Sequence, residues 1–186
     1  MAYPSRRKET CRYNIHRGKG ELMARTSTKK AQEAETITLN GEQVLIELIN
    51  DNAVIPEAKT EGAGCMDIAI PMAVSVPPVA VQSKATEIPL GFKVLVPKGH
   101  TLRIQLRSSV GRDYPIALAN TEGIVDEDFR GEVKLYIRNF SKHIVYLEEG
   151  QRIAQCWLEK TQPMTFVEGE VIEDTERGTE SGSTGK

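Results

Sequence analysis

Long hydrophobic runs are missing from the sequence, and none approaches the roughly 18 apolar residues that a membrane-spanning helix needs. No signal-peptide core follows the N-terminus. Cysteine is scarce, since Cys11, Cys65 and Cys156 form an odd, widely spaced set without a CxxC pair or a Cys/His pattern. Such a set argues against a disulfide framework and a zinc site, and it fits a reducing compartment. We therefore expect a soluble, intracellular protein of the cytoplasm with no membrane partner.

The chain also has little net charge, -2, although its two ends differ. Residues 1–30 hold nine Lys and Arg against two acids, a net charge of +7, which leaves the rest of the chain at -9. Because nucleic-acid phosphates attract positive surfaces, an acidic body is not expected to keep a stable nucleic-acid partner.

Residues 1–40 are polar, basic and without hydrophobic periodicity, which predicts a disordered N-terminal leader. A transit peptide for an organelle, or a tail that touches nucleic acid, remains the alternative. Met23 could also serve as a start, so that part of this leader would be absent from the working protein.

Long amphipathic helices are lacking between residues 41 and 173, where short apolar stretches alternate with turn signals. Thr101–Arg107 is the clearest strand, because apolar and polar residues alternate along it. Regular turn spacing predicts one all-β domain, a sandwich or barrel, over residues 41–173. One helical turn is expected after Ser108, and residues 174–186 are predicted to form a flexible arm. Further strands are expected at Val44–Ile49, Val133–Arg138, Ile144–Leu147, Ile153–Leu158 and Thr165–Ile172, with a hairpin turn at Glu149 and Gly150.

Residues 119–131 are the stretch with the most chemical character, an acidic turn bounded by glycines. The alternating strand that follows predicts a β-hairpin, with the carboxylate of Asp126 and the ring of Phe129 at its tip. Gly123 and Gly131 allow the backbone to turn tightly or to approach a ligand closely. Taken alone, the stretch favours a solvated turn, because Asp and Glu are common in turns.

Four other polar clusters accompany it, at residues 62–67, 107–111, 150–155 and 177–185. The second combines a guanidinium, two hydroxyls and backbone N–H groups, which suits either a phosphate cradle or a capped helix. The last again combines an arginine with hydroxyls and glycines. The first is compatible with a loop that ends in an acidic cap, and the third with an ordinary hairpin.

In order, the five clusters resemble the five motifs of the trimeric dUTP pyrophosphatases (dUTPases), over roughly residues 44–185. The resemblance implies a distorted, jelly-roll-like β-barrel of one domain, assembled as a homotrimer with active sites at subunit interfaces. It implies hydrolysis of dUTP to dUMP and pyrophosphate, which removes dUTP and supplies the dTMP precursor. Each site would combine the first, second and fourth motifs of one chain with the central hairpin of a neighbour and the C-terminal arm of the third.

The resemblance assigns the nucleoside to the central stretch. Asn120 and the backbone from there to Val125, with Gly123, would read the uracil edge. Phe129 stands where the family usually has Tyr, and its ring would pack on deoxyribose and exclude a 2′-hydroxyl. Asp126 would be the general base that contacts the 3′-hydroxyl and orients the attacking water. A free Asp has a pKa of about 3.9, so positioning and charge stabilisation must supply most of the rate.

The remaining motifs are assigned to the triphosphate, again by resemblance. Asp67 would act indirectly around metal and water, Gln155 would bond near the α-phosphate, and Arg152 is as compatible with a structural role as with ligand contact. Mg²⁺ is the implied cofactor, held chiefly by triphosphate oxygens and water with no direct protein ligand. The phosphate-binding residues implied are Arg107, Ser108, Ser109 and Gly111 of the second motif, and Arg177, Ser183 and Thr184 of the arm.

The last motif departs from the family pattern, since it lacks a Phe that normally covers the uracil ring and is one residue short. Weaker binding is expected, and a Phe inserted between Ser181 and Gly182 should lower KM. A dCTP deaminase shares the fold and the Arg-Ser-Ser feature, but it needs a proton-shuttling Glu, for which Glu122 is the nearby candidate. A dUTPase-like regulatory binding protein is a second alternative. A purely structural β-barrel would have little use for so many matched polar loops.

Overall fold

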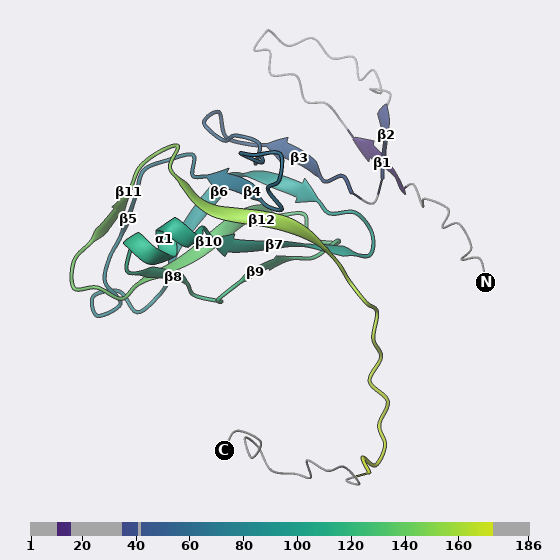
Figure 1. Cartoon of the computed structure of the whole chain (residues 1–186). Coiled ribbons are helices and arrows are strands. Elements are labelled where there is room, and N and C mark those ends of the chain that lie inside the picture. Colours follow the sequence, from purple (N-terminus) through teal and green to yellow (C-terminus); the bar gives the residue numbers. More distant parts are fainter. Residues whose placement is uncertain (1–10, 16–34, 41, 173–186) are drawn as a thin grey trace, which may run out of the picture.

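Two four-stranded antiparallel sheets form the body of the protein, for which the computed structural model describes residues 11–15, 35–40 and 42–172 (Figure 1). The first sheet has the order β3 (Leu45–Leu48), β6 (Thr86–Leu95), β10 (Glu132–Asn139) and β8 (Ile116–Leu118). The second has the order β4 (Met66–Ala69), β12 (Arg152–Lys160), β7 (His100–Leu106) and β9 (Gly123–Val125).

Smaller elements complete the described chain. A two-stranded sheet pairs β5 (Val74–Val76) with β11 (Val145–Leu147), and the short helix α1 (Ser108–Asp113) follows β7. A further antiparallel pair joins β1 (Cys11–Ile15) to β2 (Glu35–Leu39). In the described part of the chain, no helix has the length and apolar character to cross a bilayer.

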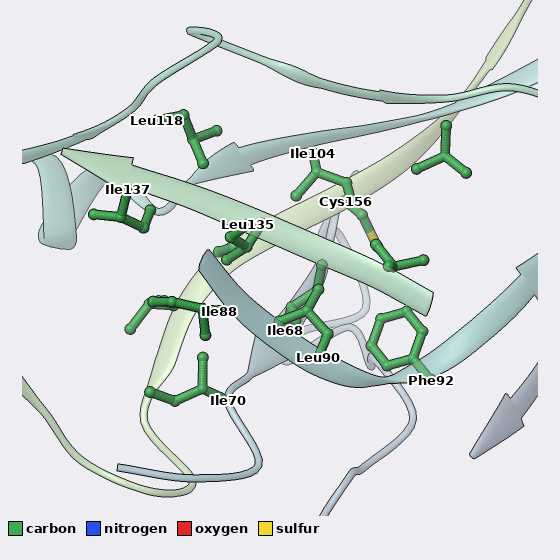
Figure 2. Close-up of a cluster of buried hydrophobic side chains, with 14 of the residues drawn as sticks. Ile68, Ile70, Ile88, Leu90, Phe92, Ile104, Leu118, Leu135, Ile137 and Cys156 are labelled. Atoms are coloured by element: carbon green, nitrogen blue, oxygen red, sulfur yellow. The ribbon is translucent and has the colours of Figure 1, made fainter. Parts of the chain in front are cut away.

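The core forms where side chains of both sheets meet, as period-2 alternation dictates. In β10 the buried residues Val133, Leu135 and Ile137 alternate with more exposed neighbours, as the sequence predicts. Figure 2 shows how Phe92 of β6 and Cys156 of β12 join the same cluster. Burial of these side chains stabilises the fold by about 25 cal/mol for each Å² of apolar surface removed from water.

The all-β prediction is confirmed, since α1 is the one helix among the residues that the structure describes. The strands expected at Val44–Ile49, Thr101–Arg107 and Ile153–Leu158 are present as β3, β7 and β12, with ends shifted by one or two residues. The helical turn expected after Ser108 is α1.

Two strand predictions differ from the structure. Residues 165–172 form no strand, because after β12 the chain leaves the body and no other described strand lies beside it (Figure 1). Their apolar side chains are exposed, Phe166 to 89%. Conversely, β1 and β2 lie within residues 1–40, where the sequence predicted no regular structure.

Both predicted hairpins are wrong in their pairing. Gly150 does turn the chain with a positive φ of 75°, but β11 pairs with β5 whereas β12 pairs with β4 and β7. Likewise β9 pairs with β7, and β10 pairs with β6 and β8. The acidic turn between β9 and β10 therefore crosses from one sheet to the other, a long-range pairing that local turn signals do not reveal.

Candidate active site

The crossing turn forms one side of a cavity of about 210 Å³. This volume is below the roughly 300–1,000 Å³ of sites that enclose a whole small molecule, so the cavity suits one part of a ligand. All five residues that the resemblance assigned to the nucleoside line it, namely Asn120, Gly123, Val125, Asp126 and Phe129. The structure thus brings together what the sequence motif grouped.

The cavity is also lined by residues that the sequence motifs did not indicate. These are Glu132, Lys134 and Tyr136 of β10 and Ile104 of β7. The alternation of β10 was a usable signal, because it already placed Lys134 and Tyr136 on the face turned away from the core. Lys134 donates to a carboxylate oxygen of Glu87 at 2.6 Å, and this hydrogen bond raises the pKa of the lysine, which keeps its positive charge.

The turn that carries Asp126 and Phe129 is held by hydrogen bonds among its own residues. The N–H of Phe129 donates to the carbonyl of Asp126 at 3.2 Å, and Arg130 Nη1 donates to the carbonyls of Glu127 and Phe129 at 2.7 and 2.8 Å. The Phe129 ring is 41% exposed, so it is available to a ligand and is no part of the core. It lies directly over Gly131, where an added Cβ would come within 2.7 Å of the ring.

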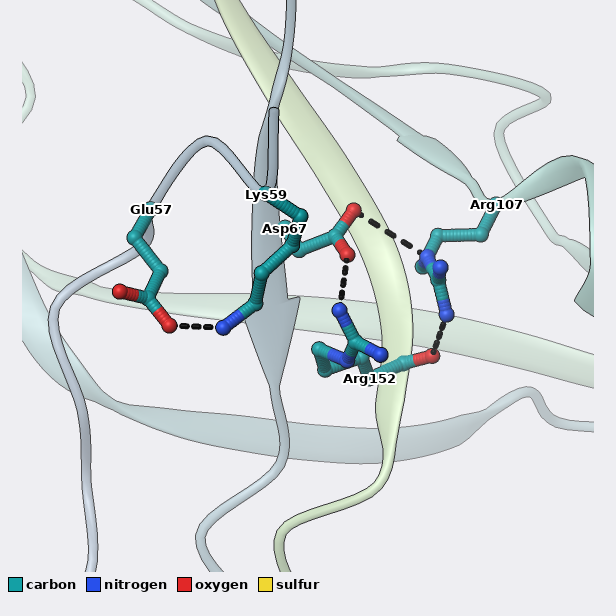
Figure 3. Close-up of polar contacts among 5 residues, drawn as sticks. All are labelled: Glu57, Lys59, Asp67, Arg107 and Arg152. Carbon is teal, nitrogen blue, oxygen red and sulfur yellow. Dashed lines mark hydrogen bonds and ion pairs between the residues drawn. The ribbon is translucent and has the colours of Figure 1, made fainter. Parts of the chain in front are cut away.

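A second group of predicted residues gathers around Asp67 on β4 (Figure 3). Its two carboxylate oxygens contact different arginines: Oδ1 lies 3.1 Å from Arg107 Nε and Oδ2 lies 2.9 Å from Arg152 Nη1. Arg107 Nη1 also donates to the Arg152 carbonyl at 3.2 Å. Two guanidinium groups share one carboxylate, so the cluster keeps a positive charge that suits phosphate.

A β-bulge explains why Arg152 and Gln155 belong to this group. The register of β12 against β4 shifts between Arg152 and Ala154, so that Ile153 and Ala154 both face the core. Gln155 then lies opposite Asp67 on the outer face. Strict alternation along β12 would place Gln155 on the same face as Ile153, and the bulge prevents this. Bulges next to functional sites commonly re-aim side chains in this way.

Arg107 leads directly into α1, which begins with Ser108 and Ser109. The N-cap of this helix is Arg107, and no side chain caps it, which argues against the capped-helix interpretation of the motif. Ser108 is exposed and Ser109 is half-buried. Gly111 has open space around it, so the structure gives no steric reason for a glycine there.

The two groups do not share one cavity in a single chain, since none of Asp67, Arg107, Ser108 and Gln155 lines the cavity under the crossing turn. The arm residues Arg177, Ser183 and Thr184 lie outside the described residues. Neither Cys65 nor Cys156 forms a disulfide, and burial, with a smaller effect of Cys65, raises the pKa of the Cys156 thiol to about 12. Cys156 is therefore a neutral core residue and no nucleophile.

Comparison with known proteins agrees with this geometry. The dUTPase family model matches residues 51–185. A deoxyuridine 5'-triphosphate nucleotidohydrolase of Fusobacterium nucleatum is 34% identical over 146 residues, which are 77% of this chain and 99% of that protein.

Two solved structures share the fold. The dUTPase of Staphylococcus bacteriophage 80alpha with dUPNHPP has a TM-score of 0.66, with 21% identity over 77% of this chain and 99% of that one. A mutant dUTPase from phage phi11 of S. aureus, described for its structural Mg(II) ion, has a TM-score of 0.59 with 18% identity over 70% and 99% of the two chains. On the family match and the near-complete coverage of the bacterial relative, the chain belongs to the dUTPase family.

Proposed function

We propose that the protein hydrolyses dUTP to dUMP and pyrophosphate. The observation that carries this proposal is that the site has two separate parts. One is a cavity lined by the carboxylate, the ring and the amide expected to bind a nucleoside. The other is an arginine cluster that suits the triphosphate. The family of the chain and the name of its bacterial relative support the same substrate.

Asp126 acts as the general base in this proposal. Its carboxylate lies at the cavity, which is also lined by the ring of Phe129 that packs on the deoxyribose. It accepts hydrogen bonds from the 3′-hydroxyl and from a water molecule, which attacks the α-phosphorus. A bond forms between the water oxygen and phosphorus, the bond to the bridging oxygen breaks, and its electron pair leaves with pyrophosphate. The proton of the water passes through Asp126 to solvent.

Arg107 and Arg152 stabilise the charge of the triphosphate, with Ser108, Ser109 and Gln155 as hydrogen-bond donors beside them. Asp67 acts through the two arginines, because both of its oxygens contact guanidinium groups. It thereby orients planar donors that suit phosphate oxygens. This makes Asp67 a positioning residue, and it gives Arg152 a part in phosphate binding that the sequence left open.

Mg²⁺ fits this arrangement as an ion bound mainly by substrate and water. The carboxylate within the arginine cluster, that of Asp67, already contacts two guanidinium groups. The described residues hold no group of three acidic, His or Cys side chains that could bind a metal. A structural Mg(II) ion is described for the phage phi11 relative. When bound, the ion neutralises phosphate charge and helps to orient the triphosphate.

We further propose that the active protein is a homotrimer of distorted, jelly-roll-like barrels, with each site built at an interface. Asp126 and Arg107 lie near opposite ends of β7 in one chain, whereas both must approach the same α-phosphate. A neighbouring copy can supply the missing half of the site. Residues 161–172 support a third contribution, because they run away from their own body directly before the arm that carries Arg177, Ser183 and Thr184 (Figure 1).

One contact of Glu122 favours the hydrolase proposal over the deaminase alternative. Glu122 accepts a hydrogen bond from Arg103 Nη1 at 2.9 Å, so its carboxylate is already engaged in an ion pair. Free thiols at Cys65 and Cys156 support the proposal of a cytoplasmic location.

The test is to incubate the purified protein and Mg²⁺ separately with dUTP, dCTP, dTTP and UTP, and to follow pyrophosphate and ammonia. We expect pyrophosphate from dUTP alone, and a rate at least about 100-fold lower for Asp126→Asn. Ammonia from dCTP would identify a deaminase instead. Absence of both products from a well-folded protein would favour a regulatory relative.

A further inference from the structure

The loop between β8 and β9 contains the one non-glycine residue with a positive φ in the described part of the chain. Thr121 has φ 60°, a left-handed conformation that β-branched residues strongly disfavour. Such strain persists only where surrounding contacts hold it. The loop carries Asn120 on one side and leads into Gly123 on the other, and both line the nucleoside cavity.

Three short-range hydrogen bonds support this conformation. The N–H of Thr121 donates to the Leu118 carbonyl at 3.1 Å, and both the Thr121 hydroxyl and the Glu122 N–H donate to the Asn120 carbonyl at 2.6 Å. The bond to Leu118, the last residue of β8, and a bond from the Ala119 N–H to the Tyr136 carbonyl of β10 at 2.7 Å tie the start of the loop to the first sheet. The two bonds to the Asn120 carbonyl lie within the loop and move with it. The Glu122 end of the loop therefore needs an anchor of its own on a rigid element.

Arg103 supplies that anchor from β7, an inner strand of the second sheet. It lies opposite Ile124 of β9 and Trp157 of β12. Its Nη1 contacts Glu122 Oε2 at 2.9 Å, and its Nε contacts Glu159 Oε2 at 2.5 Å. The side chains of Arg103 and Glu122 are only 25% and 28% exposed, which limits screening of their attraction by solvent. Of the two carboxylates that contact this guanidinium, only that of Glu122 belongs to the loop.

We propose that Arg103 and Glu122 are positioning residues for base recognition: their ion pair holds Thr121 in its left-handed conformation and thereby sets Asn120 relative to Gly123. The inference rests on the proposed function for its effect on dUTP. Loss of the pair frees the loop and weakens contacts to the base. Because these contacts are far from the reacting phosphorus, substrate and transition state lose them equally, and KM rises while kcat is retained.

The experiment compares Glu122→Ala with Glu159→Ala, since each variant removes one of the two carboxylates of Arg103 and only Glu122 lies in the loop. We expect KM for dUTP to rise about tenfold in Glu122→Ala, with kcat within about twofold of the wild type, and both constants to stay within about twofold in Glu159→Ala. Amide hydrogen exchange of residues 119–124 in the free protein should be faster in Glu122→Ala alone.

A rescue separates positioning from simple damage. Asn tolerates the left-handed region better than Thr. Thr121→Asn added to Glu122→Ala should therefore lower KM for dUTP at least about threefold relative to Glu122→Ala alone. Equal KM values in Glu122→Ala and the wild type, or an equal rise in Glu159→Ala, would overturn the proposal, as would unchanged exchange of the loop. If the wild type released no pyrophosphate from dUTP, the proposed function would fail, while the exchange comparison would still decide whether the ion pair holds the loop.

Discussion

Asp126 and Arg107 lie near opposite ends of the same strand, although the proposed mechanism brings both to one triphosphate. Val125, which precedes Asp126, is paired with Leu102 at one end of β7, and Arg107 follows the other end of this strand. Leu102 and Arg107 are five positions apart, which corresponds to roughly 17 Å at about 3.4 Å per residue. This separation is the reason for the proposal that each site takes the two side chains from different copies of the chain.

This separation predicts complementation between two inactive variants. Asp126→Asn and Arg107→Ala should each lose activity as homo-oligomers. Co-refolded in equal amounts, they should regain activity in about one quarter of the sites, because a head-to-tail interface takes Arg107 from one chain and Asp126 from the next. The measurement is the rate of pyrophosphate release from dUTP before and after mixing. A mixture as inactive as its components would place both residues in one chain.

Asp67→Asn is expected to reduce kcat/KM for dUTP about 10- to 100-fold, since two guanidinium groups lose a charged acceptor and repel each other. The same change should lower the free energy of unfolding by about 1–3 kcal/mol. Glu57→Gln is the matched control, because Glu57 contacts Lys59 nearby on the exposed surface (Figure 3). Denaturation curves and kinetics should show little effect of the control. Equal losses in the two variants would contradict the role of Asp67.

Substitutions of Phe129 test whether its ring selects deoxyribose over ribose. Phe129→Ala removes the ring that is proposed to pack on deoxyribose, so the preference for dUTP over UTP in kcat/KM should fall by at least about tenfold. Phe129→Tyr restores the usual residue of the family and should leave this preference within about twofold of the wild type. Competition between the two nucleotides gives the ratio directly. An undiminished preference in Phe129→Ala would assign sugar selection to another residue.

The buried thiol of Cys156 is expected to make the free energy of unfolding fall at high pH. Its pKa is raised from 9.0 to about 12 in the folded protein, chiefly by burial. Above pH 9 the unfolded chain releases the proton of this thiol while the folded chain retains it, so stability falls as pH rises. The contribution is fully present below about pH 9 and declines by about 1.4 kcal/mol per pH unit toward pH 12. Urea unfolding at pH 9 and 10 should show this decline in the wild type relative to Cys156→Ala, and parallel curves would exclude it.

Strand patterns in the sequence predicted much of the fold and failed where a strand depends on distant partners. Alternation located β7 and β10, because one face of each strand meets the core. It could not reveal that β9 and β10 belong to different sheets, since their partners are remote in sequence. Residues 165–172 have strand-like composition but pair with no strand in the described part of their own chain, and strand formation requires a partner.

The sequence predicted which residues belong to the candidate site, but it could not predict how they lie relative to one another. Motif order identified Asp67, Arg107 and Gln155, but their meeting depends on the β-bulge at Ile153, which strict alternation misplaces. Motifs also could not reveal Lys134 and Tyr136, which reach the cavity through the register of β10.

Gly131 of the crossing turn lies against the Phe129 ring and leaves no room for a side chain of its own. A Cβ added at Gly131 would lie 2.7 Å from Phe129 Cζ, closer than van der Waals contact allows. Gly131→Ala should therefore displace the ring from the cavity and raise KM for dUTP about tenfold, whereas stability changes little because the ring is exposed. Gly169→Ala is the control, since open space surrounds that residue. If the Phe129 ring supports substrate binding, Phe129→Ala should remove the difference between Gly and Ala at position 131. A KM effect of Gly131→Ala that persists without the ring would trace it to the backbone instead.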